Sequence, residues 1–322
     1  MNPRLRFAQL PTPIEPMPRL SSFLNGPRLW IKRDDLTGVG MGGSKIRKLE
    51  YLIAEAEANG AKTLITTGAA QSNHCRQTAA LAAKLGLKCK LVLTGENETP
   101  MDGNLLLDNM FGADITFTKN EERELILKEE FQKSWNSGER PYLIPLGGST
   151  PVGTLGYLTA FEEFLIQGTE INWIIIASSS GGTQAGLELG KRRSNWNGNI
   201  IGINVGSDFK DLPERISYLS TEASDRLGEK IEFRKDEIRI CEDYQSTGYG
   251  NTTENEIKAI QLFASLEGII LDPVYTARAA VGMMDLISKG SLKSTDSVLF
   301  WHTGGIPAVF SERYSQLIRE GY

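Results

Sequence analysis

The feature that most constrains the fold is an alternation of short apolar runs with segments of helical periodicity, from about residue 63 to the C-terminus. The apolar runs predict strands at 63–67, 88–94, 114–118, 142–145, 173–177, 199–205 and 297–301. Between them, apolar residues recur three and four positions apart, as from Ile46 to Ala56 and from Leu125 to Trp135. This alternation is typical of βα units and mostly parallel sheets.

Glycines follow several of the segments with helical periodicity. Gly60, Gly86, Gly112 and Gly138 each follow a segment of helical periodicity. Glycine adopts the left-handed backbone conformation that commonly ends a helix, so we expect a helix to end at each of them.

Composition narrows the class of protein. The chain has 322 residues, 40% of them hydrophobic and 23% charged, which is ordinary for a soluble globular protein with two domains or one large α/β unit. The net charge of -5 does not favour nucleic acid as a partner. No apolar run approaches the roughly 18 residues of a membrane span, and the N-terminus lacks the apolar core of a secretory signal. Three cysteines without CxxC spacing indicate a reducing compartment, so we expect a cytoplasmic protein.

Four predicted strands end in loops rich in glycine and hydroxyl side chains. The loops are TTGAAQSNH, PLGGSTPVGT, SSSGGTQAG and HTGGIP. Parallel sheets bind ligands at the carboxyl ends of their strands. The four loops therefore indicate a shared ligand-binding cleft.

One of these loops is a candidate phosphate site. Ser180, Gly181, Gly182 and Thr183 follow an apolar strand and open a helix, where backbone N–H groups and the positive helix end favour an anion. This loop contains neither GxGxxG nor GxxxxGKS/T, so it does not support a dinucleotide or Walker site. The alternative is a tight strand-to-helix turn with a hydroxyl cap.

A second candidate is the segment GGSKIRK. Lys45 begins an amphipathic helix after Gly42 and Gly43, which would let the backbone approach a ligand closely. A lysine at a helix N-terminus in a dry cleft loses preference for its charged form, and its free amine can form a Schiff base with an aldehyde. Lys48, one turn along, would reach an anion. The alternative is two lysines on a solvated helix face.

Polar and aromatic residues near the other strand ends complete the set. Asn73 can donate to a phenolate oxygen, and Ser72 could act as nucleophile, base or substrate contact, although either residue could simply cap a helix. Tyr249 and Tyr275 lie in turns where a ring could stack on a planar ligand, and Thr303 adjoins a glycine pair.

Jointly, the candidates match what pyridoxal 5′-phosphate requires of a protein. They supply a Schiff-base lysine, a phosphate cradle, a donor to a phenolic oxygen, tyrosines and a hydroxyl for a ring nitrogen. The two histidines, His74 and His302, show no HExxH or His/Cys clustering, so no metal site is expected.

Longer motifs add a family resemblance. The chain resembles the 1-aminocyclopropane-1-carboxylate (ACC) deaminase/D-cysteine desulfhydrase family, within the tryptophan-synthase-β-like pyridoxal phosphate enzymes of fold type II. The resemblance extends from about residue 11 to residue 310. The motifs that carry it lie at 31–35, 42–52, 71–86, 179–187, 271–279 and 302–310.

The resemblance implies a role for each candidate. Lys45 matches the lysine that holds the cofactor as an internal aldimine, and Asn73 matches the contact to its phenolic oxygen. Ser72 matches a nucleophile or substrate-contacting base. The remaining matches are Lys48 and the 180–183 backbone for the phosphate, Tyr249 and Tyr275 for the substrate, and Thr303 for the pyridine nitrogen.

The resemblance also implies an architecture. It predicts an α/β fold with two open, twisted, mostly parallel sheets flanked by helices. A small domain at 48–160 would be inserted into a larger domain formed by 1–47 and 161–322. The family further implies a homodimer.

Two positions favour one branch of the family. Similar ring-opening enzymes carry Glu at the position of Thr276 and an apolar residue at that of Thr303. A carboxylate near the pyridine nitrogen would keep it protonated, whereas a hydroxyl does not supply that charge. The hydroxyl pair therefore favours α,β-elimination. Within the family that the chain resembles, D-cysteine is then the expected substrate, with pyruvate, sulfide and ammonia as products.

Other functions remain open at this stage. They are ACC deamination, elimination from another β-substituted alanine such as cysteate, a non-catalytic pyridoxal phosphate-binding protein, and a hydrolase using Ser72, although no GxSxG motif is present. Two departures from the family pattern concern the substrate: Ser44 replaces the usual Asn, and no proline follows the pair Tyr249–Gly250. The preferred stereochemistry is also left open.

Overall fold

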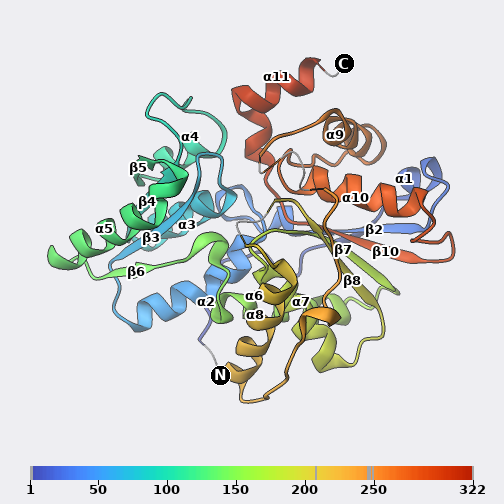
Figure 1. Ribbon diagram of the computed structural model, residues 1–322, viewed down its shortest axis with the longest axis horizontal. Coiled ribbons are helices and arrows are strands. Elements are labelled where there is room, and N and C mark those ends of the chain that lie inside the picture. The colour runs from blue at the N-terminus through green and yellow to red at the C-terminus, as the bar shows by residue number, and fades with distance from the viewer. Residues whose placement is uncertain (1–2, 207–208, 245–247, 249, 321–322) are drawn as a thin grey trace.

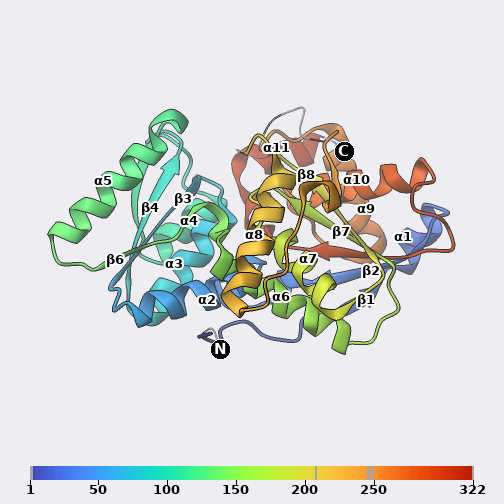
Figure 2. The ribbon, with the colours of Figure 1, turned by 60° about the horizontal axis from the view of Figure 1, so that its bottom comes forward.

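The computed structural model describes residues 3–206, 209–244, 248 and 250–320, which form two lobes, each with its own sheet (Figure 1). The six-stranded sheet has the order β1-β2-β10-β7-β8-β9, and the four-stranded sheet has the order β5-β4-β3-β6. Strands β1 and β2 precede the smaller sheet in the chain, and β7 to β10 follow it. The first and the last strand of the chain therefore both lie in the larger lobe (Figure 2).

The larger sheet is parallel except for β1, which pairs antiparallel with β2. Its strands are β1 (Ile14–Pro16), β2 (Arg28–Arg33), β7 (Trp173–Ser178), β8 (Asn199–Asn204), β9 (Ile240–Cys241) and β10 (Ser297–His302). Alternate residues of β10 pack on opposite faces: Val298 and Phe300 on one, Leu299 and Trp301 on the other. Both faces are buried, which explains why β7, β8 and β10 each contain a run of apolar residues.

Six helices cover the two faces of the larger sheet. Helices α1 (Pro18–Phe23), α9 (Glu254–Glu267) and α10 (Thr276–Ser288) supply apolar side chains to one face. On the other face, α6 (Pro151–Ile166) and α7 (Gly182–Ser194) pack directly, and α8 (Leu212–Leu227) packs on α6 and α7. The last helix, α11 (Glu312–Glu320), follows β10.

The smaller sheet is wholly parallel and contains β3 (Thr63–Ala69), β4 (Lys88–Thr94), β5 (Asp114–Thr118) and β6 (Pro141–Leu143). Helices α2 (Lys45–Ala58), α3 (Asn73–Leu85) and α4 (Gly103–Met110) share one apolar cluster with β3 and β4. Helix α5 (Arg123–Asn136) packs on the opposite face through Leu127. Since α2 also packs against α6, it joins the two lobes.

The predicted fold class is confirmed, and all seven predicted strands are present with ends within two residues of those expected. The four predicted helix-ending glycines all have positive φ angles, between 68° and 75°. The proposed domain limits at 47/48 and 160/161 both fall inside helices, α2 and α6, and the division stays a prediction. Among the described residues, no helix is both long enough and apolar enough to cross a membrane.

Candidate active site

A cavity of about 300 Å³ lies where the strand-end loops of the two sheets meet. Its lining includes eight of the predicted site residues, namely Lys45, Ser72, Asn73, Ser180, Gly181, Thr183, Tyr275 and Thr303. Lys48 and Gly182 are not part of the lining, and Tyr249 lies outside the described residues. The described lining contains no Asp or Glu. The shared cleft expected from the loop compositions is therefore present.

Lys45 is the first residue of α2, and the chain before it is held tightly. The Ser44 N–H donates to the Thr303 carbonyl at 2.9 Å, which ties the lysine loop to the end of β10. A Cβ on Gly42 would lie 2.0 Å from the Asp35 carbonyl oxygen. The expectation that Gly42 and Gly43 admit a ligand is therefore wrong: these glycines allow the chain to approach itself, and neither lines the cavity.

The Lys45 amine has few contacts inside the cavity. It donates to Ser44 Oγ at 3.1 Å and lies 5.9 Å from the centre of the Tyr275 ring. Burial lowers the pKa of this amine to about 8, although Asp272 opposes the shift, and Arg76 adds to it. A larger share of free amine is therefore available near neutral pH than for a solvated lysine, as predicted.

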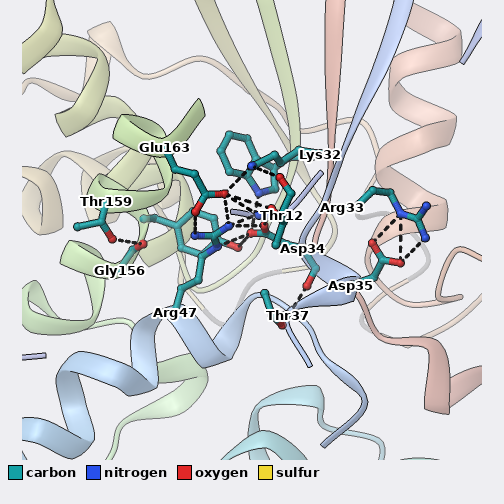
Figure 3. A network of polar contacts seen from close by, with 12 residues as sticks. Thr12, Lys32, Arg33, Asp34, Asp35, Thr37, Arg47, Gly156, Thr159 and Glu163 are labelled. Carbon is teal, nitrogen blue, oxygen red and sulfur yellow. Dashed lines mark hydrogen bonds and ion pairs between the residues drawn. The ribbon is translucent and has the colours of Figure 1, made fainter. Parts of the chain in front are cut away.

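Helix α2 is anchored by a buried network of charged groups on the side of Arg47 (Figure 3). The Arg47 guanidinium donates to Asp34 at 2.8 and 3.0 Å and to Glu163 at 2.9 and 3.0 Å. Lys32 donates to the same Glu163 at 2.6 Å. The network joins α2 to β2 and α6, and so fixes the helix that carries Lys45 and Lys48.

Lys48 is fully buried, so the alternative of a solvated lysine is wrong for this residue. Its amine donates to Ser149 Oγ at 3.0 Å and contacts the Gly147 carbonyl at 3.3 Å. Within the described part of the chain, no carboxylate lies within ion-pair distance of it. Burial lowers its pKa, and the positive charges of Lys45 and Arg215 act in the same direction. Burial without a counter-ion disfavours the charged form of this amine, and an anionic ligand beside it would favour that form, so the position suits an anion.

Ser149 connects Lys48 to the predicted phosphate loop. Its hydroxyl lies 2.7 Å from Ser180 Oγ and accepts from the Gly182 N–H at 3.2 Å. Gly182 opens α7, so the positive end of that helix faces the same point. Sequence reasoning noted the loop PLGGST but did not identify Ser149. The hydroxyls, the helix end and the unneutralised lysine together fit a phosphate dianion.

Ser72 and Asn73 lie at the start of α3. Ser72 accepts a hydrogen bond from the Cys75 N–H at 3.2 Å and is the helix cap, so the capping alternative is confirmed alongside its position in the cavity lining. Asn73 accepts at Oδ1 from Asn104 Nδ2 at 3.1 Å. His74 bonds Thr66 through Nε2 at 2.9 Å, and burial lowers its pKa well below the usual value.

Only one residue of the predicted hydroxyl pair reaches the cavity. Thr303 is part of the lining, whereas the buried Thr276 hydroxyl donates to Asp272 Oδ1 at 2.7 Å and is not. The Thr276 hydroxyl is used within the turn, so only Thr303 of the pair can reach a ring nitrogen, whereas the absence of a carboxylate at position 276, on which the branch prediction rests, is unaffected. Asp272 also accepts from the N–H groups of Val274, Tyr275 and Thr276, so it fixes the turn that presents Tyr275. No local pattern singled out Asp272 beforehand.

The family model described as "Pyridoxal-phosphate dependent enzyme" matches residues 5–304. The chain therefore belongs to this family of pyridoxal phosphate enzymes.

Within the family, the chain is 42% identical to the D-cysteine desulfhydrase of Klebsiella pneumoniae (strain 342), with 96% of each chain aligned. It superimposes with a TM-score of 0.91 on a crystal structure described as "the ACC deaminase homologue", at 40% identity, covering 99% of this chain and 96% of the other. Threonine deaminase isoform 2 of Solanum lycopersicum shares the fold, with a TM-score of 0.67, 18% identity, and coverage of 96% and 82% respectively. These similarities confirm the family resemblance and fold type II.

Proposed function

We propose that this enzyme catalyses α,β-elimination from D-cysteine, consuming one water and giving pyruvate, hydrogen sulfide and ammonia. The observation that carries the proposal is the Lys45 amine, with its lowered pKa, in a cavity whose described lining has no carboxylate. The similarity to a D-cysteine desulfhydrase supports the choice of substrate.

The residues divide into two groups in this proposal. Lys45, Lys48, Asn73, Thr303 and the 180–183 backbone hold the cofactor, with Lys48 and the α7 N-terminus at its phosphate, Asn73 at its phenolic oxygen and Thr303 at its ring nitrogen. Ser72, Tyr249 and Tyr275 contact the amino acid. When bound, pyridoxal phosphate withdraws electrons from the carbon that bears the amino group.

The chain's own groups then move the proton. With the amino acid and the cofactor bound, the Lys45 amine would take the α-proton, because its lowered pKa keeps it largely unprotonated in mildly alkaline solution. The C–S bond breaks as sulfide leaves the β-carbon, and water hydrolyses the resulting enamine to pyruvate and ammonia. Sulfide is a good leaving group, so Thr303 in place of a carboxylate is sufficient at the ring nitrogen.

A direct comparison of substrates tests this proposal. We expect D-cysteine to give equal amounts of sulfide and pyruvate, and to be used more efficiently than L-cysteine, cysteate or ACC. ACC is the main alternative, because the structural neighbour is described as an ACC deaminase homologue, and its turnover would release 2-oxobutyrate. If the enzyme released 2-oxobutyrate from ACC, or sulfite from cysteate, faster than sulfide from D-cysteine, then ACC or cysteate would be the preferred substrate instead.

Replacing Lys48 with Met should have effects of opposite sign on the apo-protein and on cofactor binding. The change replaces a buried amine that has no counter-ion with an apolar side chain, so the free energy of unfolding of the apo-protein should rise by about 1 kcal/mol. Loss of a charged partner for the phosphate should weaken cofactor binding roughly 10- to 100-fold. Urea unfolding of the apo-protein and titration with the cofactor measure both. If cofactor binding weakened but the apo-protein were not stabilised, burial of the Lys48 amine without a counter-ion would not be costly, and this description of Lys48 would be wrong.

Capture of the cofactor by the apo-protein should depend on pH through Lys45. Only the unprotonated amine attacks an aldehyde, so the rate should rise as pH increases and level off above about 8, the lowered pKa of this amine. A solvated lysine would give a rate still rising near pH 10. Stopped-flow absorbance of apo-protein mixed with pyridoxal phosphate measures the profile.

We further propose that the protein is a homodimer. We also propose that it is cytoplasmic, and that residues 48–160 form a small domain inserted into a larger one. Support for the dimer comes from exposed apolar side chains on three adjacent elements: Met41 on η2 (Val39–Met41), Met110 on α4 and Phe310 on η6 (Ile306–Phe310). Helix α4 packs against η6, and Gly40 lies beside the Phe111 ring that follows α4. A Met110→Glu variant should shift the mass measured by light scattering from dimer to monomer, while exposed Lys128→Glu should not.

A further inference from the structure

A chain of side-chain amides leads from the surface of α4 to the cavity. It begins at Asp102, which accepts from the Glu312 N–H at 2.6 Å and from Gln71 Nε2 at 2.9 Å. Gln71 Oε1 in turn accepts from the Asn104 N–H at 2.8 Å. Asn104 Nδ2 donates both to the Gln71 carbonyl at 3.0 Å and to Asn73 Oδ1 at 3.1 Å.

The chemistry of these groups fixes the orientation of every amide in the chain. An ionised carboxylate only accepts, so the Gln71 nitrogen must face Asp102 and its oxygen must face the Asn104 N–H. A backbone carbonyl also only accepts, so the Asn104 nitrogen must face Gln71. The remaining hydrogen of that nitrogen then requires the oxygen of Asn73. The orientation of Asn73 is therefore determined by its neighbours rather than assigned arbitrarily.

These hydrogen bonds hold a donor, the Nδ2 atom of Asn73, in a fixed position at the cavity. With Oδ1 held by Asn104, Asn73 presents Nδ2 as its remaining polar atom, and no described residue accepts from it. A Cβ on Gly305 would lie 2.8 Å from this nitrogen, so the glycine leaves room for Asn73 to reach forward. Asn104 is itself fully buried and outside the lining.

We propose that Asn104 is a positioning residue that makes Asn73 a hydrogen-bond donor toward the cofactor's phenolic oxygen. This inference rests on the proposed role of Asn73. If the side-chain amide of Asn73 were rotated so that Oδ1 and Nδ2 changed places, Oδ1 would face the phenolate. The attraction between donor and acceptor would then become a repulsion between two oxygen atoms. Asn104 thus acts on the cofactor through one amide, without touching it.

A double-mutant cycle on cofactor affinity tests the proposal. Asn104→Asp replaces the donor with an acceptor, so Asn73 should turn and the dissociation constant for pyridoxal phosphate should rise roughly 10- to 100-fold. Asn104→Leu removes the donor without favouring the reversed amide and should have a smaller effect. The matched control is Asn109→Asp, the same change at an exposed site on α4, which should stay within about twofold of the parent.

The cycle is completed in an Asn73→Ala background, where Asn104→Asp should change affinity less than about threefold because the amide it orients is gone. An equal loss in both backgrounds would show a merely structural role and overturn the proposal. Thermal unfolding of each apo-protein checks that the variants fold, and if Asn104→Asp does not, Asn104→Leu completes the same cycle. Unchanged affinity in Asn73→Ala alone would instead reject the role given to Asn73 in the proposed function.

Discussion

Replacing Lys45 with Ala should lower turnover of D-cysteine by at least about 1000-fold, because it removes both the covalent attachment of the cofactor and the proposed base for the α-proton. The same variant should lose added pyridoxal phosphate on dialysis and lack the visible absorbance of the lysine-linked cofactor. Folding should be preserved, since the amine has only Ser44 as a hydrogen-bond partner among the described residues.

The matched control is Lys128→Ala, which removes an exposed lysine on α5 and should keep parental turnover and absorbance. Added methylamine offers a second check, because a small external amine can restore part of the proton transfer but not the covalent attachment. Full turnover by the Lys45→Ala protein would exclude the proposed mechanism. Loss of turnover with the absorbance retained would place the covalent link on another lysine.

Among the strands that the sequence predicted, β7 and β10 of the larger sheet show most clearly how burial produces an apolar run. The segments WIIIA and, after Ser297, VLFW, in β7 and β10, are continuously apolar because helices cover both faces of their sheet. Strand β2 was missed because its sequence, RLWIKR, contains charged residues. One of them, Lys32, is nevertheless buried, because it forms an ion pair with Glu163. Strands β1 and β9 have only three and two residues, too few for a periodic signal.

The candidate site divides in a similar way. Lys45 and the glycine- and hydroxyl-rich loops were predictable because each lies in one short segment at a strand or helix end. Ser149, Asp272 and Asn104 were not, because their importance comes from hydrogen bonds to partners that only the fold brings together. Thr276 shows the converse: a plausible motif residue whose hydroxyl the local turn uses up.

Replacing Arg47 with Leu should strongly destabilise the protein, because it breaks a buried network of charged groups. Asp34 is fully buried and accepts from Arg47, Tyr157 Oη and Trp301 Nε1. Arg47→Leu would leave that carboxylate buried without its main cation, and Lys32 would remain as the partner of Glu163. Breaking a buried pair in this way costs about 3–5 kcal/mol in the free energy of unfolding.

The loss of stability caused by Arg47→Leu should become smaller as the pH is lowered. Arg47 and Lys32 oppose the effect of burial and lower the pKa of Asp34 to about 2, below its unfolded value near 4. A carboxylate with a lowered pKa stabilises the folded state above its unfolded pKa, and that stabilisation is lost as pH falls toward 2. The difference between the parent and Arg47→Leu should therefore be largest near pH 7 and shrink at pH 3.

Urea unfolding of the apo-proteins at both pH values measures this difference, with Arg234→Leu as the control. Arg234 pairs with Asp236 on the surface, where both side chains are about 70% exposed, so its loss should cost less than about 1 kcal/mol. Because Arg47 lies between Lys45 and Lys48 on α2, its replacement should also weaken cofactor binding, whereas Arg234→Leu should not. Equal urea midpoints for the two variants would mean that hydrophobic packing, rather than these charges, holds α2 against the larger lobe.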